Sequence, residues 1–367
     1  MSSMSQKTAA IFTTSEGHES IAQAVADALE GDFQTKIFYE DIPMVKLYMA
    51  FYQFMPSLAH LPGKAINFKQ SIDTIRKIAQ LKYQKKINDF FAKHSPDVMI
   101  NTYGVFNSCL EEIQHLTKVP LVNIITDPKN PYPVVISPNA KTNIAFDQEN
   151  IEYCQQFYPE AVYKKYGWFV RKKFDERYDS TKVRQKLKLD ADKLTFLIAS
   201  GSEGSNLVLK VLPTLLFAKQ PLQVVVACGK NKALYKSVKS LNSVLNKTGG
   251  HNLLTPIKFT PDIHQYMQAA DLVIGKAGPN MLFETVATQT PFFAITHISG
   301  QEDGNLDIIR DYNLGYVEEN IIKAQKLIRE ILDNPQQLQN FETELIEMKK
   351  YNQQAKKKLL QLVKNLT

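Results

Sequence analysis

The apolar residues of this chain fall mainly into short continuous runs, separated by longer stretches in which Leu recurs among Lys and Gln. Seven short runs are rich in β-branched and aromatic residues and are bounded by Pro, Gly or polar residues: 8–14, 97–101, 121–126, 194–200, 223–228, 271–274 and 292–296. Such runs are typical of strands that are buried on both faces of a parallel sheet. The pattern therefore predicts an α/β protein with parallel sheets, whose helices fill the intervals.

Two segments repeat the same order of elements. A strand at Thr8–Thr14 is followed by the turn 15–18 and by a helix at Glu19–Leu29, whose apolar residues recur at helical spacing. The strand at Leu194–Ser200 is likewise followed by a turn of small residues and a helix start. Each segment has the order of elements with which a Rossmann-like domain begins. Because the two lie nearly half a chain apart, and 367 residues exceed what one core usually supports, we predict two α/β domains.

The expected boundary lies between Trp168 and Lys186, where the chain is charged and weakly apolar, as linkers are. From Asn320 to Thr367 the pattern is helical, with a break at Asn334-Pro335. The predicted organisation is a first domain over 1–172, a second domain over 173–345 and a C-terminal helix over 346–367.

Composition and charge narrow the function only slightly. A net charge of +7 favours polyanionic partners, which include nucleic acid, anionic lipid and phosphorylated substrates, although a solvated lysine-rich surface explains it equally well. The three scattered cysteines form neither a disulfide framework nor a zinc motif, and they fit a reducing cytoplasm. No signal peptide and no bilayer-spanning apolar run is found. We therefore expect a protein that is cytoplasmic or peripheral to a membrane.

The segment 44–61 departs from the alternation of strands and helices. It is bordered by Lys46 and Lys64 and carries four aromatic residues: Tyr48, Phe51, Tyr52 and Phe54. Aromatic side chains beside lysines suit the headgroup boundary of an anionic leaflet. The alternative is an ordinary core helix packed against the sheet.

Two loops after neighbouring strands carry the sharpest candidate chemistry. After the strand 271–274, the residues 275–280 form a glycine turn into a helix that carries Glu284. Glycines allow close backbone approach, and a helix N-terminus offers free N–H groups and a positive dipole end to a phosphate. The Glu284 carboxylate can accept hydrogen bonds from both hydroxyls of a ribose.

The second loop, 297–305, follows the strand 292–296 and opens another helix. Its Gln301, Glu302 and Asn305 supply donors and acceptors matched to sugar hydroxyls. Both loops lie at the carboxyl ends of strands, where open α/β sheets bind ligands. Either loop alone would be a weak signal, because glycine turns often merely cap strands.

Taken in order, the two loops resemble the donor site of the monogalactosyldiacylglycerol-synthase type of glycosyltransferases, a group akin to the peptidoglycan N-acetylglucosaminyltransferase. That family carries a lysine–proline–glycine turn, a helical glutamate and a proline–glycine–glutamine–glutamate–x–glycine–asparagine loop. The first loop matches through Lys276, Gly278, Pro279 and the adjoining Asn280, with Glu284 on the helix. The second loop matches through Gly300, Gln301, Glu302, Gly304 and Asn305, and Ser299 replaces the proline.

The resemblance covers most of the chain. The segment 167–171 looks like the family's step into the second domain, with Phe169 in place of a proline, and 228–231 looks like its cysteine–glycine–lysine–asparagine turn. The glycine-rich turn that faces the diphosphate corresponds to Gly201, Ser202, Glu203 and Gly204. The position that grips uracil through the backbone lies near Phe259. The aromatic segment 44–61 sits where relatives carry a membrane-contacting insertion.

The acceptor side departs more from the family. Gly17-His18 matches the end of a glycine–glycine–histidine turn, and Thr126-Asp127 matches a threonine–aspartate pair. Relatives then have histidine–proline where this chain has Asn130-Pro131, and they often have a histidine at the position of Tyr103. A general base must take the proton of the acceptor hydroxyl, and His18 and Asp127 are the two candidates.

The resemblance implies a GT-B-type fold: two Rossmann-like domains facing a cleft, with a C-terminal helix crossing back to the first domain. It implies an inverting transferase that needs no cofactor and no metal, with a UDP-sugar as co-substrate. The diphosphate would be stabilised by the helix N-termini after Gly201 and Gly278, together with Lys276. The acceptor would be a membrane lipid, most simply diacylglycerol, reached from the cytoplasmic face of an anionic membrane.

Other functions stay open on the sequence alone. A transferase with a polyprenyl or other acceptor, a non-hydrolysing UDP-sugar epimerase and a catalytically silent relative share this fold. A dinucleotide-binding enzyme is disfavoured because no full GxGxxG is present. A nucleic-acid-binding protein is disfavoured because no standard signature accompanies the positive charge. No feature of the sequence indicates an oligomeric state.

Overall fold

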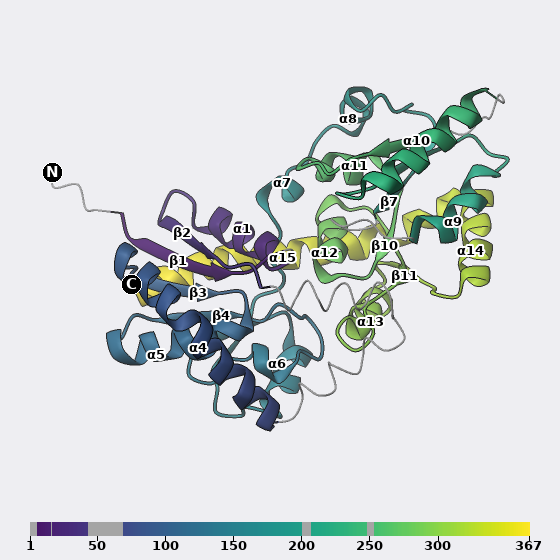
Figure 1. Cartoon of the computed structure of the whole chain (residues 1–367). Coiled ribbons are helices and arrows are strands. Elements are labelled where there is room, and N and C mark those ends of the chain that lie inside the picture. Colours follow the sequence, from purple (N-terminus) through teal and green to yellow (C-terminus); the bar gives the residue numbers. More distant parts are fainter. Residues whose placement is uncertain (1–5, 16, 43–68, 200–206, 248–252) are drawn as a thin grey trace. The chain divides into compact units, whose positions relative to one another are not determined.

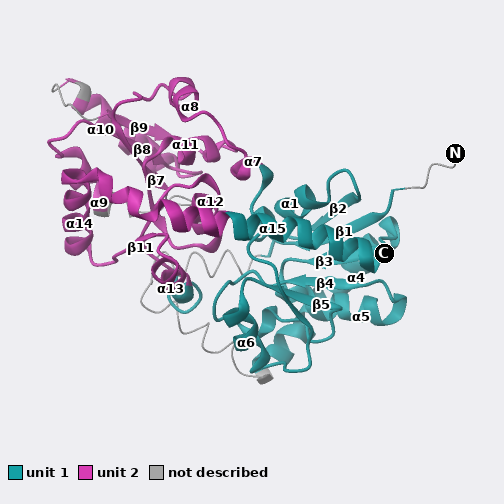
Figure 2. Ribbon diagram, turned by 180° about the vertical axis from the view of Figure 1, so that it is seen from behind, with its two compact units in different colours: residues 1–172, 298–304, 350–367 teal, residues 173–297, 305–349 magenta. Residues whose placement is uncertain are grey.

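The computed structural model describes residues 6–15, 17–42, 69–199, 207–247 and 253–367. The four aromatic residues of the segment 44–61 and the turn residues Gly201, Ser202, Glu203 and Gly204 lie outside the described residues. The chain divides into two compact units (Figures 1 and 2). Unit 1 comprises 1–172, 298–304 and 350–367, and unit 2 comprises 173–297 and 305–349.

Unit 1 contains a six-stranded parallel sheet in the order β2-β1-β3-β4-β5-β6. Its strands are β1 (Thr8–Thr13), β2 (Gln34–Tyr39), β3 (Val98–Asn101), β4 (Leu121–Ile124), β5 (Thr142–Ala145) and β6 (Tyr163–Lys165). Its helices are α1 (Gly17–Leu29), α4 (Lys69–His94), α5 (Asn107–Thr117), α6 (Gln148–Gln155) and the last part of α15 (Glu342–Leu366), with short 3₁₀ turns η2 (Gly104–Phe106) and η3 (Pro133–Val135).

Helices cover both faces of this sheet because the crossovers run in opposite directions. The step from β1 through α1 to β2 moves one way across the sheet, and the step from β2 through α4 to β3 moves the other way. Right-handed crossovers then place α1 and α4 on opposite faces (Figure 1). On the α4 face, Phe12 and Met99 of the sheet pack with Ile87 of α4 and Leu110 of α5.

Unit 2 repeats the arrangement in the order β12-β11-β10-β7-β8-β9. Its strands are β7 (Leu194–Ala199), β8 (Leu222–Ala227), β9 (Leu253–Ile257), β10 (Leu272–Lys276), β11 (Phe292–Thr296) and β12 (Gly315–Val317). Its helices are α7 (Lys172–Asp175), α8 (Ser180–Lys186), α9 (Leu207–Leu216), α10 (Lys232–Lys247), α11 (Ile263–Ala269), α12 (Pro279–Thr288), α13 (Asp303–Asp311) and α14 (Ile321–Asp333), followed by the 3₁₀ turn η4 (Pro335–Phe341) and the start of α15. The first residue of α7, Lys172, groups with unit 1, and so do the first two of α13.

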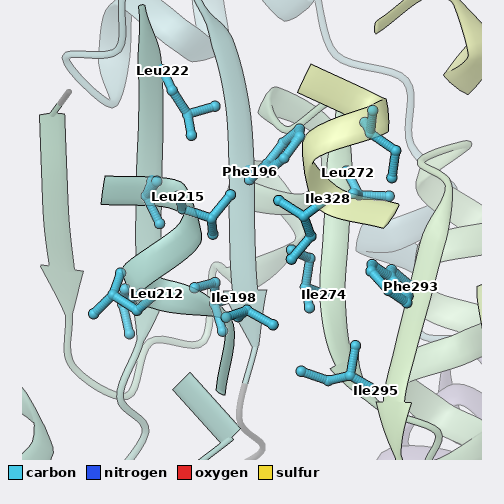
Figure 3. Packing of buried hydrophobic residues seen from close by; sticks show 14 of the residues in the cluster. Phe196, Ile198, Leu212, Leu215, Leu222, Leu272, Ile274, Phe293, Ile295 and Ile328 are labelled. Carbon is cyan, nitrogen blue, oxygen red and sulfur yellow. The ribbon is translucent and has the colours of Figure 1, made fainter. Parts of the chain in front are cut away.

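The core of unit 2 fills one face of its sheet (Figure 3). Leu212 and Leu215 of α9 and Ile328 of α14 pack against Phe196 and Ile274 of the central strands, and all five are at most 4% exposed. Burying apolar surface of this extent is the main force that holds the helices on the sheet. The predicted break at Asn334-Pro335 is confirmed, since α14 ends at Asp333 and η4 begins at Pro335.

The α/β class with parallel sheets is confirmed, and several boundaries need correction. The turn predicted over 275–280 is shorter, because β10 continues through Lys276 and α12 begins at Pro279. Gly275 belongs to the strand: a Cβ there would lie 3.0 Å from the carbonyl oxygen of Ala199 and 3.1 Å from the ring of Phe292. The stretch predicted as a linker, between Trp168 and Lys186, contains helices α7 and α8.

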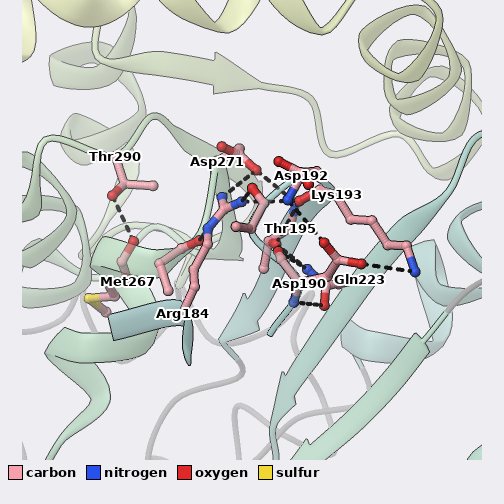
Figure 4. Close-up of polar contacts among 11 residues, drawn as sticks. Arg184, Asp190, Asp192, Lys193, Thr195, Gln223, Met267, Asp271 and Thr290 are labelled. Carbon is pink, nitrogen blue, oxygen red and sulfur yellow. Dashed lines mark hydrogen bonds and ion pairs between the residues drawn. The ribbon is translucent and has the colours of Figure 1, made fainter. Parts of the chain in front are cut away.

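A polar cluster ties α8 to the sheet of unit 2 at its amino edge (Figure 4). The guanidinium of Arg184 lies 2.9 Å from the carboxylate of Asp271, and its Nε donates to the carbonyl of Ala269 at 3.0 Å. The same Asp271 carboxylate accepts a hydrogen bond from the backbone N–H of Thr195 at 2.7 Å. Arg184 therefore links the helix to the first residues of β7 and to the residue before β10.

We expect Arg184→Met to destabilise this edge by about 2 kcal/mol, because it leaves partly buried hydrogen-bonding groups without a partner. Hydrogen exchange of the β7 and β10 amides, followed by mass spectrometry, measures the loss of protection. Lys182→Met is the matched control, since the Lys182 side chain is 82% exposed in its pair with Asp179 and such pairs add little. Equal protection in the two variants would show that the Arg184 cluster does not stabilise the unit.

Candidate active site

The carboxyl edge of the unit 1 sheet brings three predicted residues to adjacent strands. The chain leaves β1 toward one side of the sheet and leaves β3 toward the other, so the neighbouring ends of β1 and β3 form the switch point where open α/β sheets bind ligands. His18 lies in the first turn of α1 after β1, and Tyr103 is the second residue after the end of β3. Asp127 lies three residues beyond the end of β4, the next strand.

His18 is held by the backbone that follows β3. Its Nδ1 lies 2.7 Å from the carbonyl oxygen of Thr102. A carbonyl only accepts, so Nδ1 carries the proton and Nε2 carries the lone pair. Burial lowers the pKa of His18 to about 4, and the Thr102 carbonyl offsets part of that shift. The imidazole is therefore neutral at pH 7.

Tyr103 packs edge-on against this imidazole, with the ring centroids 4.9 Å apart. Its other ring neighbour is Phe106, at 5.2 Å. Burial, with a smaller contribution from Tyr83, raises the pKa of Tyr103 far above its usual value. The phenol therefore stays protonated and can donate a hydrogen bond, but it does not act as a base at neutral pH.

Asp127 has an unusually basic carboxylate. Burial raises its pKa to about 6, the hydrogen bond from the Gln301 side chain lowers it, and the charge of Glu302 raises it. Its backbone carbonyl accepts a hydrogen bond from Asn150 at 3.2 Å, which fixes the segment after β4. A carboxylate with this pKa is mostly ionised at pH 7 and accepts a proton more readily than an ordinary aspartate.

The loop 298–304 groups with unit 1, although its flanking residues belong to unit 2 (Figure 2). Its Gln301 side chain lowers the pKa of Asp127, and its backbone closely approaches Lys129: a Cβ on Gly304 would lie 2.7 Å from the Lys129 Cβ. Gly304 is thus needed for this close approach. On the sequence alone we expected Gln301 to serve the sugar donor only, and its effect on the candidate base was not predicted because the two residues are far apart in the chain.

The remaining polar residues of this loop shape its backbone. The Glu302 carboxylate accepts the backbone N–H of Ile298 at 2.6 Å, and the Asp303 carboxylate accepts that of Gly300 at 2.7 Å. Asn305, which is 2% exposed, donates to the carbonyl of Ala277 at 2.8 Å and ties the start of α13 to the turn after β10. Through these hydrogen bonds, Glu302 and Asn305 fix the backbone of the predicted donor loops.

In unit 2, the switch point lies between β7 and β10, and the turn after β10 leads into α12. Gly278 precedes the helix and Pro279 is its first residue, where a missing N–H costs nothing. Lys276 ends β10, Asn280 is the second helical residue, and Glu284 is buried in the middle of α12. The first N–H groups of α12 thus face the carboxyl edge of the sheet, as a phosphate site requires.

Phe259 lies two residues beyond β9 and is 58% exposed. Its backbone N–H donates to the carbonyl of Gly229 at 2.8 Å, and the ammonium of Lys230 lies 5.9 Å from its ring centroid. The predicted uracil position and the turn 228–231 are therefore brought together in unit 2. No helix among the described residues is long and apolar enough to cross a membrane.

Comparisons with known proteins find similarity to glycosyltransferases. Residues 195–364 match the Glycosyltransferase family 28 C-terminal domain. Processive diacylglycerol beta-glucosyltransferase of Bacillus licheniformis is 28% identical over 267 residues, which are 72% of this chain and 66% of the relative. Probable monogalactosyldiacylglycerol synthase 3, chloroplastic, of Oryza sativa subsp. japonica is 24% identical over 86% of this chain and 65% of the relative. The chain thus spans about two thirds of the length of these relatives.

The fold also has solved counterparts. The crystal structure of Acinetobacter baumannii MurG aligns with a TM-score of 0.63 over 98% of this chain and 99% of that one, at 14% identity. At this identity the likeness shows the fold alone, which is the GT-B type that the sequence predicted. Over residues 195–364 the chain is thus similar to the glycosyltransferases of family 28.

Proposed function

We propose that the protein transfers a hexose from a UDP-sugar to a diacylglycerol-type membrane lipid, with inversion and without a metal bound by paired aspartates. The observation that carries the proposal is that the predicted donor loop 298–304 packs within unit 1, where Gly304 closely approaches Lys129 and where the Gln301 side chain lowers the pKa of Asp127, the candidate base. A loop that reads the donor sugar thereby also tunes the group that activates the acceptor. Neither a pure binding module nor a silent relative requires that pairing.

The donor would be held by groups at the carboxyl edge of unit 2. The free N–H groups at the start of α12, after Gly278, suit the diphosphate, with Lys276 beside them. Glu284 accepts the ribose hydroxyls, and backbone groups near Phe259 accept the uracil. As UDP departs, the same helix end stabilises the charge that develops on its phosphate.

In the chemical step the acceptor hydroxyl oxygen bonds to the anomeric carbon, the bond from that carbon to UDP breaks, and the hydroxyl proton passes to a base. We assign the base to Asp127, because its pKa of about 6 lies nearer the working pH than the value of about 4 for His18. Proton transfer is most effective when the pKa of the base is close to that pH. His18, neutral with its lone pair on Nε2, orients the bound acceptor as a hydrogen-bond acceptor.

Two observations support a lipid acceptor. The names of the relatives refer to diacylglycerol, and this chain carries a net positive charge. A surplus of seven positive charges attracts the protein to an anionic leaflet. The aromatic segment 44–61, which lies outside the described residues, adds the side chains that suit a headgroup layer. We therefore place the protein on the cytoplasmic face of a membrane, with no nucleic-acid partner.

A screen of UDP-glucose, UDP-galactose and UDP-N-acetylglucosamine against vesicles of diacylglycerol in phosphatidylglycerol tests this function. We expect UDP release together with a glycosylated lipid in the mass spectrum for one of these sugars. The stereochemistry of the product reports inversion, and activity in the presence of EDTA reports metal independence. Tight UDP binding without turnover, or an epimerised UDP-sugar formed without lipid, would refute the proposal.

For the donor site, we expect Glu284→Gln to raise the KM for the UDP-sugar by about 10- to 100-fold, since it weakens two charge-assisted hydrogen bonds. The KM for the lipid should stay the same. Asp307→Asn, at a half-exposed carboxylate of α13, is the control for the loss of one negative charge in unit 2. A normal donor KM in Glu284→Gln would remove Glu284 from the site.

For the base, we expect kcat to fall tenfold per pH unit below an apparent pKa of about 6, because only ionised Asp127 accepts a proton. Burial raises this pKa, so the inactive protonated form persists to higher pH than for an ordinary aspartate. The Gln301 hydrogen bond favours the ionised form, so Gln301→Leu should move the acid limb to higher pH at saturating donor. Gln80→Leu, on an exposed surface, is the control. A limb near pH 4 in the wild type would instead assign the base to His18.

A further inference from the structure

Three buried asparagines run side by side across the middle of the unit 1 sheet. Asn101 of β3 pairs in register with Asn123 of β4, which pairs with Asn143 of β5. All three side chains are fully buried. Two residues earlier on the same face, the sheet carries Met99 and Leu121, which pack against α4 and α5. We call Asn101, Asn123 and Asn143 the asparagine ladder.

The amides of the asparagine ladder form a head-to-tail chain. Asn123 Nδ2 donates to Asn143 Oδ1 at 2.8 Å, and Asn101 Nδ2, whose two N–H groups also face closer acceptors, lies 3.3 Å from Asn123 Oδ1. Aligned amides polarise one another, so such a chain is worth most when every member is satisfied. Apolar side chains would fill this interior without any risk of an unpaired polar group, so the amides need an explanation beyond packing.

Besides a 3.4 Å bond from Asn143 to the carbonyl of Val162, the bonds that the ladder makes outside itself go to two connecting segments. Asn101 accepts the N–H of Tyr103 at 3.2 Å and donates to its carbonyl at 3.0 Å. Asn123 donates to the carbonyl of Val135 at 2.9 Å. Asn143 accepts the N–H of Ser137 at 2.9 Å and donates to its carbonyl at 2.8 Å. The ladder therefore holds the segments 103–107 and 133–137.

These two segments touch each other through their backbones. A Cβ placed on Gly104 would lie 2.3 Å from the Cα of Val135, so η2 and η3 meet at a position that only glycine allows. Asn107 joins them as well, since it accepts from Asn101 at 2.7 Å and donates to the carbonyl of Val135 at 3.2 Å. The ladder and the two segments thus form one rigid polar block under the carboxyl edge of the sheet.

The block continues directly into the groups that hold His18. Thr102, between Asn101 and Tyr103, presents the carbonyl that accepts from His18 Nδ1. The Thr102 hydroxyl donates to the hydroxyl of Thr13 at 2.9 Å and so locks the ends of β1 and β3 together. A shift of Asn101 would therefore move both the carbonyl and the Tyr103 ring that define the orientation of the imidazole.

We propose that the asparagine ladder positions the acceptor side of the active site by fixing Thr102 and Tyr103, and through them the tautomer of His18. Its members are positioning residues, since they are buried and act on His18 and the acceptor only through Thr102 and Tyr103. The consequence for acceptor binding rests on the proposed function. The consequence for the imidazole does not, so the two can be tested separately.

The test compares Asn123→Leu, which keeps the side-chain shape and removes the amide, with the control Asn352→Leu. Asn352 is equally a buried asparagine of unit 1, and its Oδ1 accepts the backbone N–H of Trp168 at 2.9 Å, away from the ladder. ¹⁵N NMR of labelled histidines, with the His18 signals assigned by His18→Gln, reads the tautomer. We expect Nδ1–H alone in the wild type and in Asn352→Leu, and a mixture with Nε2–H in Asn123→Leu.

In steady-state assays, Asn123→Leu should raise the KM for the lipid about tenfold and leave the KM for the UDP-sugar unchanged, whereas Asn352→Leu should change neither. If Asn123→Leu does not fold, Asn143→Ser at the outer end of the ladder should give the same changes to a smaller degree. An unchanged His18 tautomer in the folded ladder variant would overturn the proposal. A wild type that transfers no sugar would refute the proposed function only, because the NMR comparison still decides the role of the ladder.

Discussion

Parallel strand pairing constrains everything else in this protein. Two neighbouring strands run parallel only when the chain crosses back over a face of the sheet, so every strand of a six-stranded parallel sheet ends at the same edge. In unit 1 this brings the residues after β1, β3 and β4 to one line, although His18 and Asp127 are more than a hundred positions apart in the sequence. In unit 2 it does the same for the loops after β10 and β11. The helices that cover the faces supply the N-termini beside which these loops lie.

Burial of the charged form then gives the two candidate bases different characters. Removing a group from water disfavours its charged state, so the same cause lowers the pKa of His18 to about 4 and raises that of Asp127 to about 6. The imidazole becomes a weak base with a fixed lone pair, and the carboxylate becomes a better base than usual. The sequence alone did not show which of the two residues is the better base. Burial distinguishes them, because it lowers the pKa of a group that is positive when charged and raises the pKa of a group that is negative when charged.

The sequence predicted the strands whose apolar runs are buried on both faces, and it missed those without such runs. The missed strands include β2, which is partly exposed along most of its length, and β6 and β12, with three residues each. The two loops of the predicted donor site could be proposed because the residues of each loop are close together in the sequence. The contact between Gln301 and Asp127 and the register of the asparagine ladder could not, because both depend on pairings between residues distant in the chain. An asparagine near a strand end is otherwise read as a turn residue.

The departures on the acceptor side have local physical explanations. Asn130 has a φ of +51°, in the left-handed region where asparagine is among the most favourable side chains. The backbone conformation of the turn after β4 therefore explains why an asparagine is suitable at this position. The Asp127 carboxylate, three residues earlier, is still influenced by Gln301. Tyr103, where the resemblance led us to expect a histidine, has a phenol that stays protonated at neutral pH and packs on His18. Neither the Asn130 amide nor the Tyr103 phenol changes its protonation near pH 7, whereas burial raises the pKa of Asp127 to about 6.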